Sequence, residues 1–461
     1  MAIDRKFEER VLNKSLSLLI RHFRAHKFSG EFFASGNGRI LLTNEGVLTF
    51  EYIAEVESED KPKSYKPGEL IDPKDLCLLE MTDEHGTEWY VMDVFLRRGL
   101  FPKFMHQSRG SAQLHYIETN ERLQHVRGFG GRVILTSNKP IDLPRNIVTE
   151  TKHLERRAKS KAGKWIWSGV SLDKAKIHSG PYELDISWGA SDTLHCKYTL
   201  RKSNPRFHDR LCETIMFLTG IIPRPVLCAR SFGHFETVTI YSHRVVPVKM
   251  QRTRVPLQPT TERFNPYSLF KKYMLFSLNN SDDSGWSNLS REWTSIILSR
   301  NVSVSAEILA TCIAIEWATK SYFGNVRISR IPKSAMRKLL DGIKAAKVSE
   351  AVTKRAVDVV SGALSQVRCK DILYALHKRG LITMEMVSAW DKNRNSSAHG
   401  SRTYAVTQKQ LSDSDALFQL LCLLFFRIIG YKGRYIDYSA VGWPISKSKE
   451  TNVDPQTLSN S

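Results

Sequence analysis

The stretch 412–430, SDSDALFQLLCLLFFRIIG, has the periodicity of a long buried helix. Its first residues resemble a capping box, and Gly430 is a typical stop signal. One apolar stripe follows the spacing i, i+3, i+4, i+7, i+8 and i+11, through Leu417, Leu420, Leu421, Leu424, Phe425 and Ile428. The other faces are apolar too, with Gln419 and Arg427 as polar breaks. A helix that is apolar all round is buried on every side, which suggests a core position and a subunit interface.

Further helices are predicted upstream of this stretch. Apolar stripes at helical spacing indicate helices over residues 305–320, 332–343, 352–367, 371–379 and 383–394. Pro332 occupies the first turn of the helix predicted over residues 332–343. Gly380 ends the short helix predicted over residues 371–379. We therefore expect an all-α helical bundle over residues 266–445, followed by a disordered tail over 446–461.

The sequence of residues 1–265 predicts a β-rich region. We expect it to consist of two parts that divide near residues 130–150. A helix is expected over residues 1–30, and the turn at 35–38 followed by apolar runs at 40–42 and 47–53 is typical of a hairpin. The glycine-rich residues 128–131 are interpreted as a turn. Further short strands are predicted at 88–91, 132–135, 165–167, 182–186 and 237–241, with one helix at 204–220. The fold class is α+β and multidomain.

The chain has 461 residues and a formal net charge of +21. Residues 1–100 carry 14 Lys and Arg against 18 Asp and Glu, so the remainder holds an excess of +25. Such a local excess suggests a polyanionic partner, most simply nucleic acid, although solubility is an alternative reason. The seven cysteines form no Cys-x-x-Cys pair, which argues against a disulfide framework or zinc ribbon. No membrane span or secretory signal is recognised, so we expect a cytoplasmic location.

The segment 390–400, WDKNRNSSAHG, carries the residues best suited to chemistry. Arg394 and His399 are five positions apart across an expected helix end, a spacing that can aim both side chains at one point. A histidine can move the proton of a ribose 2′-hydroxyl, and a guanidinium can stabilise charge on a phosphate. Asn395 could fix the imidazole tautomer or bind a phosphate oxygen. The alternative is structural, with Arg394 paired to a carboxylate and His399 capping the last helix.

Residues 290–440, with this segment and the closing run 427–439, resemble HEPN domains. In that family an Arg-x4–6-His motif lies between the last two long helices. Many members are metal-independent endoribonucleases whose motifs meet across a homodimer axis. The resemblance implies that Arg394 and His399 are the catalytic pair and that Asn395 assists. It also implies 2′-hydroxyl attack that leaves a 2′,3′-cyclic phosphate, with no metal and no cofactor.

The whole arrangement resembles the ApeA-type anti-phage defence proteins. That likeness implies abortive infection, with the N-terminal region sensing a phage-encoded trigger protein or inhibiting the nuclease. RNA is then the substrate, and transfer RNA is one candidate. Glu316 lies on an apolar helix stripe, where it could orient Arg394, or it could be a partly exposed residue at the stripe's edge.

Two groups of basic residues are predicted RNA contacts. Lys392 and Arg402 flank the motif, while Lys152, Arg156 and Arg157 precede Trp165 and Trp167, a combination that suits single-stranded RNA. The alternative for the second group is a solvated linker before a core strand. Two rival functions remain open: a non-catalytic RNA-binding HEPN protein, and an interaction scaffold that recognises a phage protein.

Overall fold

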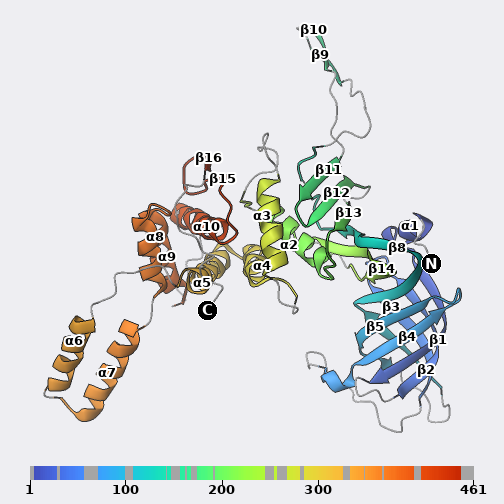
Figure 1. Cartoon of the computed structure of the whole chain (residues 1–461), viewed down its shortest axis with the longest axis horizontal. Coiled ribbons are helices and arrows are strands. Elements are labelled where there is room, and N and C mark those ends of the chain that lie inside the picture. The colour runs from blue at the N-terminus through green and yellow to red at the C-terminus, as the bar shows by residue number, and fades with distance from the viewer. Residues whose placement is uncertain are drawn as a thin grey trace. The chain divides into compact units, whose positions relative to one another are not determined.

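The computed structural model combines a large antiparallel sheet with helices, so the chain has an α+β fold (Figure 1). It describes residues 5–27, 32–56, 71–98, 107–141, 143–146, 156–160, 163–167, 174–189, 193–243, 254–256, 267–280, 285–324, 333–346, 348–365, 368–398 and 406–447. The chain divides into two units. The first unit comprises residues 1–216 and 221–248, and the second comprises residues 217–220 and 249–461.

The first unit is built around a twelve-stranded antiparallel sheet. Along its main path the strands are β11 (Lys174–Ser179), β12 (Tyr182–Trp188), β13 (Leu194–Leu200), β8 (Tyr116–Thr136), β5 (Glu88–Val94), β4 (Cys77–Asp83), β1 (Ser17–Lys27), β2 (Phe32–Leu42), β3 (Leu48–Val56), β7 (Gln107–Leu114) and β6 (Arg97–Arg98). β14 (Arg224–Tyr241) pairs with β8 outside this path. A separate hairpin consists of β9 (Arg156–Ser160) and β10 (Gly163–Trp167), and a 3-10 helix covers Pro73–Asp75.

The long strand β8 joins two parts of the sheet, β11–β13 on one side and the strands from β5 to β6 on the other. Its first half lies beside β5, where Tyr90 is opposite Glu118, and its second half pairs with β13 from residue 129 to 135. The predicted turn at residues 128–131 is therefore wrong, because these glycines lie inside a strand. A Cβ at Gly130 would meet the Tyr198 carbonyl oxygen at 2.6 Å, so the close approach of the neighbouring strand requires glycine there.

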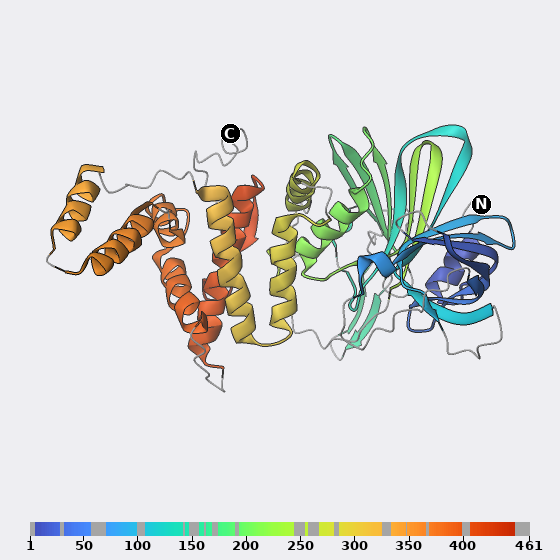
Figure 2. The same ribbon diagram turned by 90° about the horizontal axis from the view of Figure 1, so that it is seen from below.

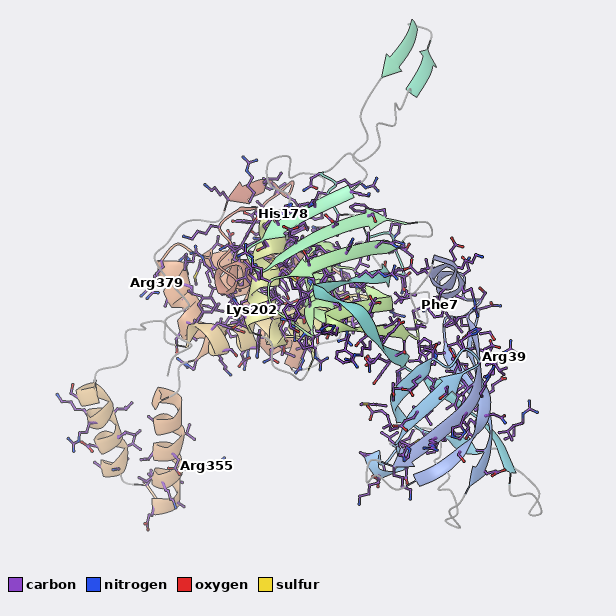
Figure 3. The ribbon with its side chains drawn as sticks, turned by 45° about the vertical axis from the view of Figure 1, so that its right-hand side comes forward. Phe7, Arg39, His178, Lys202, Arg355 and Arg379 are labelled. Carbon is purple, nitrogen blue, oxygen red and sulfur yellow. The ribbon has the colours of Figure 1, made fainter. Side chains whose placement is uncertain are left out.

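The predicted helix over residues 1–30 is also wrong. Helix α1 spans only Arg5–Leu12, and β1 follows it. Within β1, Leu18 and Ile20 are buried while Leu19 is half exposed, which is the two-residue alternation of a strand. The core of this unit gathers aromatic rings from several strands, including the edge-to-face pair of Phe23 and Phe50. Phe7 of α1, which Figure 3 labels, belongs to the same core. Its ring stacks on that of Trp89 with centroids 6.5 Å apart.

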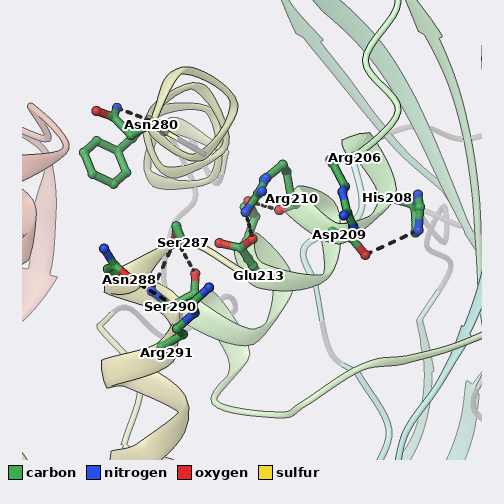
Figure 4. A network of polar contacts seen from close by, with 12 residues as sticks. Arg206, His208, Asp209, Arg210, Glu213, Asn280, Ser287, Asn288, Ser290 and Arg291 are labelled. Carbon is green, nitrogen blue, oxygen red and sulfur yellow. Dashed lines mark hydrogen bonds and ion pairs between the residues drawn. The ribbon is translucent and has the colours of Figure 1, made fainter. Parts of the chain in front are cut away.

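Helix α2 (Phe207–Thr219) carries a buried ion pair. The side chains of Arg210 and Glu213 are fully buried and in contact, one helical turn apart (Figure 4). Near the start of the helix, Asp209 accepts a hydrogen bond from Arg206 at 3.3 Å and lies 3.3 Å from the imidazole of His208. This helix confirms the one predicted over residues 204–220.

The second unit is mainly helical. Its helices are α3 (Ser268–Asn279), α4 (Asn288–Arg300), α5 (Val304–Phe323), α6 (Lys333–Ala345), α7 (Glu350–Ser365), α8 (Cys369–Lys378), α9 (Met384–Ala398) and α10 (Gln408–Ile428). It also contains a two-stranded sheet of β15 (Arg434–Ile436) and β16 (Ile445–Lys447), so the expectation of an all-α bundle is wrong in this detail. Helix α5 packs against α4, α8, α9 and α10, and Figure 2 shows it running beside α10.

Helix α10 begins earlier than its sequence pattern suggests. Its capping box is formed by Thr407 and Gln410, not by residues 412–415. Leu417, Leu421 and Phe425 are fully buried within this one chain, and Phe425 packs against Trp293. Burial on every side is thus achieved without a second subunit, which removes the reason for placing α10 itself at an interface.

All seven cysteines are buried and free of disulfides. Burial raises the pKa of the Cys312 and Cys369 thiols to about 12. Loss of solvation also raises the pKa of the other five thiols. At neutral pH every thiol is therefore protonated and sealed in the interior.

Candidate functional site

Arg394 lies on the last part of α9, one turn before the end of that helix. Trp390 and Val387, on the preceding turns, are buried in the second unit. Asn393 anchors the neighbouring position, because its amide donates to the Ala389 carbonyl oxygen at 2.8 Å and to Asp413 Oδ2 at 3.1 Å. The Arg394 side chain is 48% exposed, so it is accessible to a ligand.

Helix α9 runs four residues beyond the predicted end at Arg394. It includes Asn395 and ends at Ala398, so the expected polar turn after Arg394 is absent from the described backbone. His399 follows Ala398 directly in sequence and lies outside the described residues. The described helix therefore extends four residues past Arg394, about one helical turn, and ends at Ala398.

Glu316 of α5 binds the Arg394 guanidinium with both carboxylate oxygens. Arg394 Nε donates to Glu316 Oε2 at 3.0 Å, and Nη2 donates to Oε1 at 3.4 Å. Lys320, one turn further along α5, donates to Glu316 Oε1 at 2.7 Å. One carboxylate thus bridges two cations, and the fork of the guanidinium is held in a fixed plane.

The electrostatics of this cluster favour the charged forms of Arg394 and Glu316. The hydrogen bond from Arg394 lowers the pKa of the Glu316 carboxyl, and the hydrogen bond from Lys320 adds to the effect. In return, the carboxylate raises the pKa of Arg394 above its ordinary value. The cluster of Arg394, Lys320 and Glu316 carries a net charge of +1.

An aromatic platform lies under the arginine. The Arg394 guanidinium carbon is 5.8 Å from the centroid of the Trp390 ring. Trp390 is itself fixed, since its indole N–H donates to the Cys312 carbonyl oxygen on α5 at 3.3 Å. A cation over an indole face adds to the positioning of the guanidinium.

Other charged residues of α9 face neighbouring helices. Lys392, a predicted RNA contact, is half exposed and lies 3.7 Å from Asp413 of α10. On the other side, Asp391 accepts a hydrogen bond from Lys370 of α8 at 2.6 Å. Sequence reasoning missed Lys320, Lys370 and the platform role of Trp390. For Lys320 the i, i+4 spacing from Glu316 was an available signal.

The remaining predicted site residues are not placed together. His399, Arg402 and Lys152 lie outside the described residues, and only the backbone of Asn395 is described. Arg156 and Arg157 belong to β9, where the register sets Arg156 opposite Trp167 and Arg157 opposite Ile166. These basic residues are thus part of a hairpin rather than of a linker before a strand.

Among the described residues, no group of three or more His, Cys, Asp or Glu side chains is arranged to hold a metal ion. In the same part of the chain, no helix combines the length and the apolar character needed to cross a membrane. Comparisons of the chain with protein-family models, with curated proteins and with solved structures find no match.

Proposed function

We propose that the chain is a metal-independent endoribonuclease of the HEPN type, in which Arg394 and His399 form the catalytic pair. The observation that carries this proposal is the half-exposed Arg394 guanidinium on the last part of α9, held in one plane by the bidentate contact with Glu316. A positioned guanidinium is suited to charge that develops on a phosphate in the transition state.

The proposed reaction uses general acid–base catalysis. An imidazole takes the proton of a ribose 2′-hydroxyl while its oxygen attacks the adjacent phosphorus. The bond from phosphorus to the 5′-oxygen breaks, and that oxygen takes up a proton. The products are a 2′,3′-cyclic phosphate and a 5′-hydroxyl. Arg394 binds the non-bridging phosphate oxygens, and Glu316 acts as a positioning residue.

The proposed active form is a homodimer in which a second copy contributes its own Arg394 and His399. The exposed apolar side chains of Leu309 and Ile313 support a contact surface beside this site. They lie on α5 at i, i+4 spacing, and Glu316 follows Ile313 by three residues on the same face. Ile313→Lys is expected to convert a dimer to a monomer in light-scattering measurements and to reduce cleavage; an unchanged dimer would remove this surface from the proposal.

The wider biological role follows the same proposal. The β-rich N-terminal region acts as the sensor or inhibitor, ahead of a C-terminal HEPN domain in residues 266–445. The trigger is a phage-encoded protein, transfer RNA is a candidate target, and the setting is abortive infection in the cytoplasm.

A second candidate function is a non-catalytic RNA-binding protein. The observation that favours it is the occupation of both Glu316 oxygens by Arg394, because the same contact serves as an ordinary structural ion pair. On this reading the Glu316 carboxylate offsets the charge that Arg394 would otherwise present to a phosphate. RNA would then bind at the surface without being cut.

The decisive experiment incubates purified protein with RNA in EDTA and analyses the ends of the products. We expect cleavage by the native chain, 2′,3′-cyclic phosphate ends, and a loss of about 10²–10⁴-fold in rate for His399→Ala. Cleavage by His399→Ala at the native rate, or a strict need for a divalent metal, would refute the nuclease proposal. RNA binding without any cleavage would favour the second candidate.

A further inference from the structure

The first unit contains an open pocket of about 570 Å³ that the proposed nuclease does not use. It is lined by α1 and by the strands β8, β11, β12 and β13. Its charged lining is predominantly basic and comprises Arg132, Lys174, Lys176, Lys197 and two acids, Glu8 and Asp185. A pocket of this size lies in the range that holds small ligands.

The antiparallel register explains why the basic side chains meet. Lys176 is opposite Asp185, Asp185 is opposite Lys197, and Lys197 is opposite Arg132, so one row crosses four strands. Directly opposite residues share a face of the sheet. The next row on this face, two residues along each strand, holds Lys174, Ser187 and His195.

The row contains an electrostatic conflict. Lys197 and Arg132 are directly opposite each other, and like charges in that position destabilise a sheet. Glu8 forms an ion pair with Arg132, and Asp185 lies 3.9 Å from Lys176. Four cations against two carboxylates leave a charge of +2 in the pocket, which matches a phosphate dianion.

Polar groups beside the lysines can supply hydrogen bonds. The His195 Nε2 atom is 3.3 Å from the Thr193 hydroxyl, which fixes the ring. Burial lowers the pKa of His195, so this imidazole is neutral at physiological pH and can donate or accept without adding charge. Ser187 adds a hydroxyl from the adjacent strand.

We propose that this pocket binds the phosphate group of a nucleotide, with Lys197 and Lys174 as its principal cationic contacts. The observations that carry this are the unbalanced charge, the like-charged pair in register and the concave shape. The phosphate could belong to a free nucleotide or to an RNA strand, since both present the same chemistry. This site lies wholly in the first unit and does not depend on Arg394 or His399.

The test measures binding to the full-length protein by titration calorimetry at low salt, with AMP, inorganic phosphate and a short single-stranded RNA as separate probes. We expect Lys197→Gln to weaken binding about tenfold, through loss of one charge-assisted hydrogen bond, and Lys174→Gln/Lys197→Gln to abolish it. The matched control is Lys202→Gln, an exposed lysine just after β13 that does not line the pocket (Figure 3). Its affinity is expected to stay within twofold of the native value.

The outcomes distinguish a phosphate of a free nucleotide from a phosphate of an RNA strand, and they distinguish both from failure of the proposal. Binding of AMP with this dependence on Lys197 identifies a free nucleotide, and binding of RNA alone with the same dependence identifies strand phosphates. Absence of binding by every probe overturns the proposal. Equal weakening by Lys197→Gln and Lys202→Gln also overturns it, because that result describes non-specific attraction to a basic surface.

Discussion

Two arginine–glutamate pairs in this molecule have the same chemistry and opposite surroundings. Arg210 and Glu213 pair on one helix with both side chains fully buried. Arg394 and Glu316 pair between α9 and α5, with the arginine 48% exposed. The first guanidinium is inaccessible to any ligand, whereas the second can reach one. Exposure, rather than residue type, thus separates an arginine that serves the fold from one that can serve chemistry.

The energetics of the two pairs differ for the same reason. A buried pair loses the hydration of both ions, so removal of one partner leaves a charge in an environment of low dielectric constant. An exposed pair gains little, because water screens its attraction and the long side chains lose conformational entropy. Four measurements can break or sharpen this contrast.

The largest effect on stability is expected at the buried pair. Glu213→Gln leaves the Arg210 charge without this carboxylate and is expected to lower the free energy of unfolding by about 3–5 kcal/mol. Urea denaturation followed by circular dichroism measures the change. The double variant Arg210→Met/Glu213→Leu is the control and should recover most of the loss. A cost below about 1 kcal/mol for Glu213→Gln would break the contrast.

The exposed pair should show the reverse behaviour. Arg394→Ala is expected to lower the rate of RNA cleavage by about 10²–10³-fold, as loss of one transition-state contact does. The free energy of unfolding should fall by no more than about 1 kcal/mol. The matched control is Arg368→Ala, because Arg368 forms a comparable exposed pair with Asp371 at 3.2 Å. Equal losses of activity in both variants would show that Arg394 has no special role.

The pH dependence of stability sharpens the role of Glu316. Its folded-state pKa is lowered below the ordinary value of 4.5, chiefly by Arg394. The stability from this group is therefore present above pH 4.5 and is lost as the pH falls through the lowered pKa. Glu316→Gln is expected to be slightly less stable than the native chain at pH 6 and to lose less stability on acidification. Parallel stability curves for the two proteins would contradict the assignment.

The smallest effect is expected at Lys320. This side chain is 56% exposed and pairs with Glu316 at i, i+4 spacing. Lys320→Ala should cost about 0.3–0.5 kcal/mol in thermal or urea denaturation and should leave the cleavage rate within about twofold, because Arg394 retains its bidentate contact. A loss of cleavage as large as that of Arg394→Ala would instead make Lys320 part of the phosphate-binding site.

Local patterns predicted much of the fold. The apolar runs at 40–42 and 47–53 correctly predicted the pairing of β2 with β3, in which Ile40 lies opposite Phe50. The turn predicted at 35–38 is wrong, because these residues lie inside β2 and pair with β3. The helical stripe of α10 was equally readable. The helix predicted over residues 1–30 failed because Leu18, Leu19 and Phe23 fit a helical stripe, although the chain pairs them in β1.

The sequence identified Arg394 and Glu316 as candidate site residues, but it did not specify how they are arranged in space. Arg394 and Glu316 are 78 positions apart, and their contact depends on the packing of α9 against α5. No local pattern states whether an arginine will be buried, as Arg210 is, or exposed. The register that brings Lys197 opposite Arg132 likewise depends on the pairing of β13 with β8, which sequence spacing does not specify.

The sealed thiols have a practical consequence. Since all seven native cysteines are buried and protonated, maleimide reagents should not react with them in the folded protein. A cysteine introduced at Val302, which is 79% exposed between α4 and α5, would then take up a spin label alone. Dipolar spectroscopy on such labels reports the separation between copies of the chain in solution, without removal of a single native sulfur.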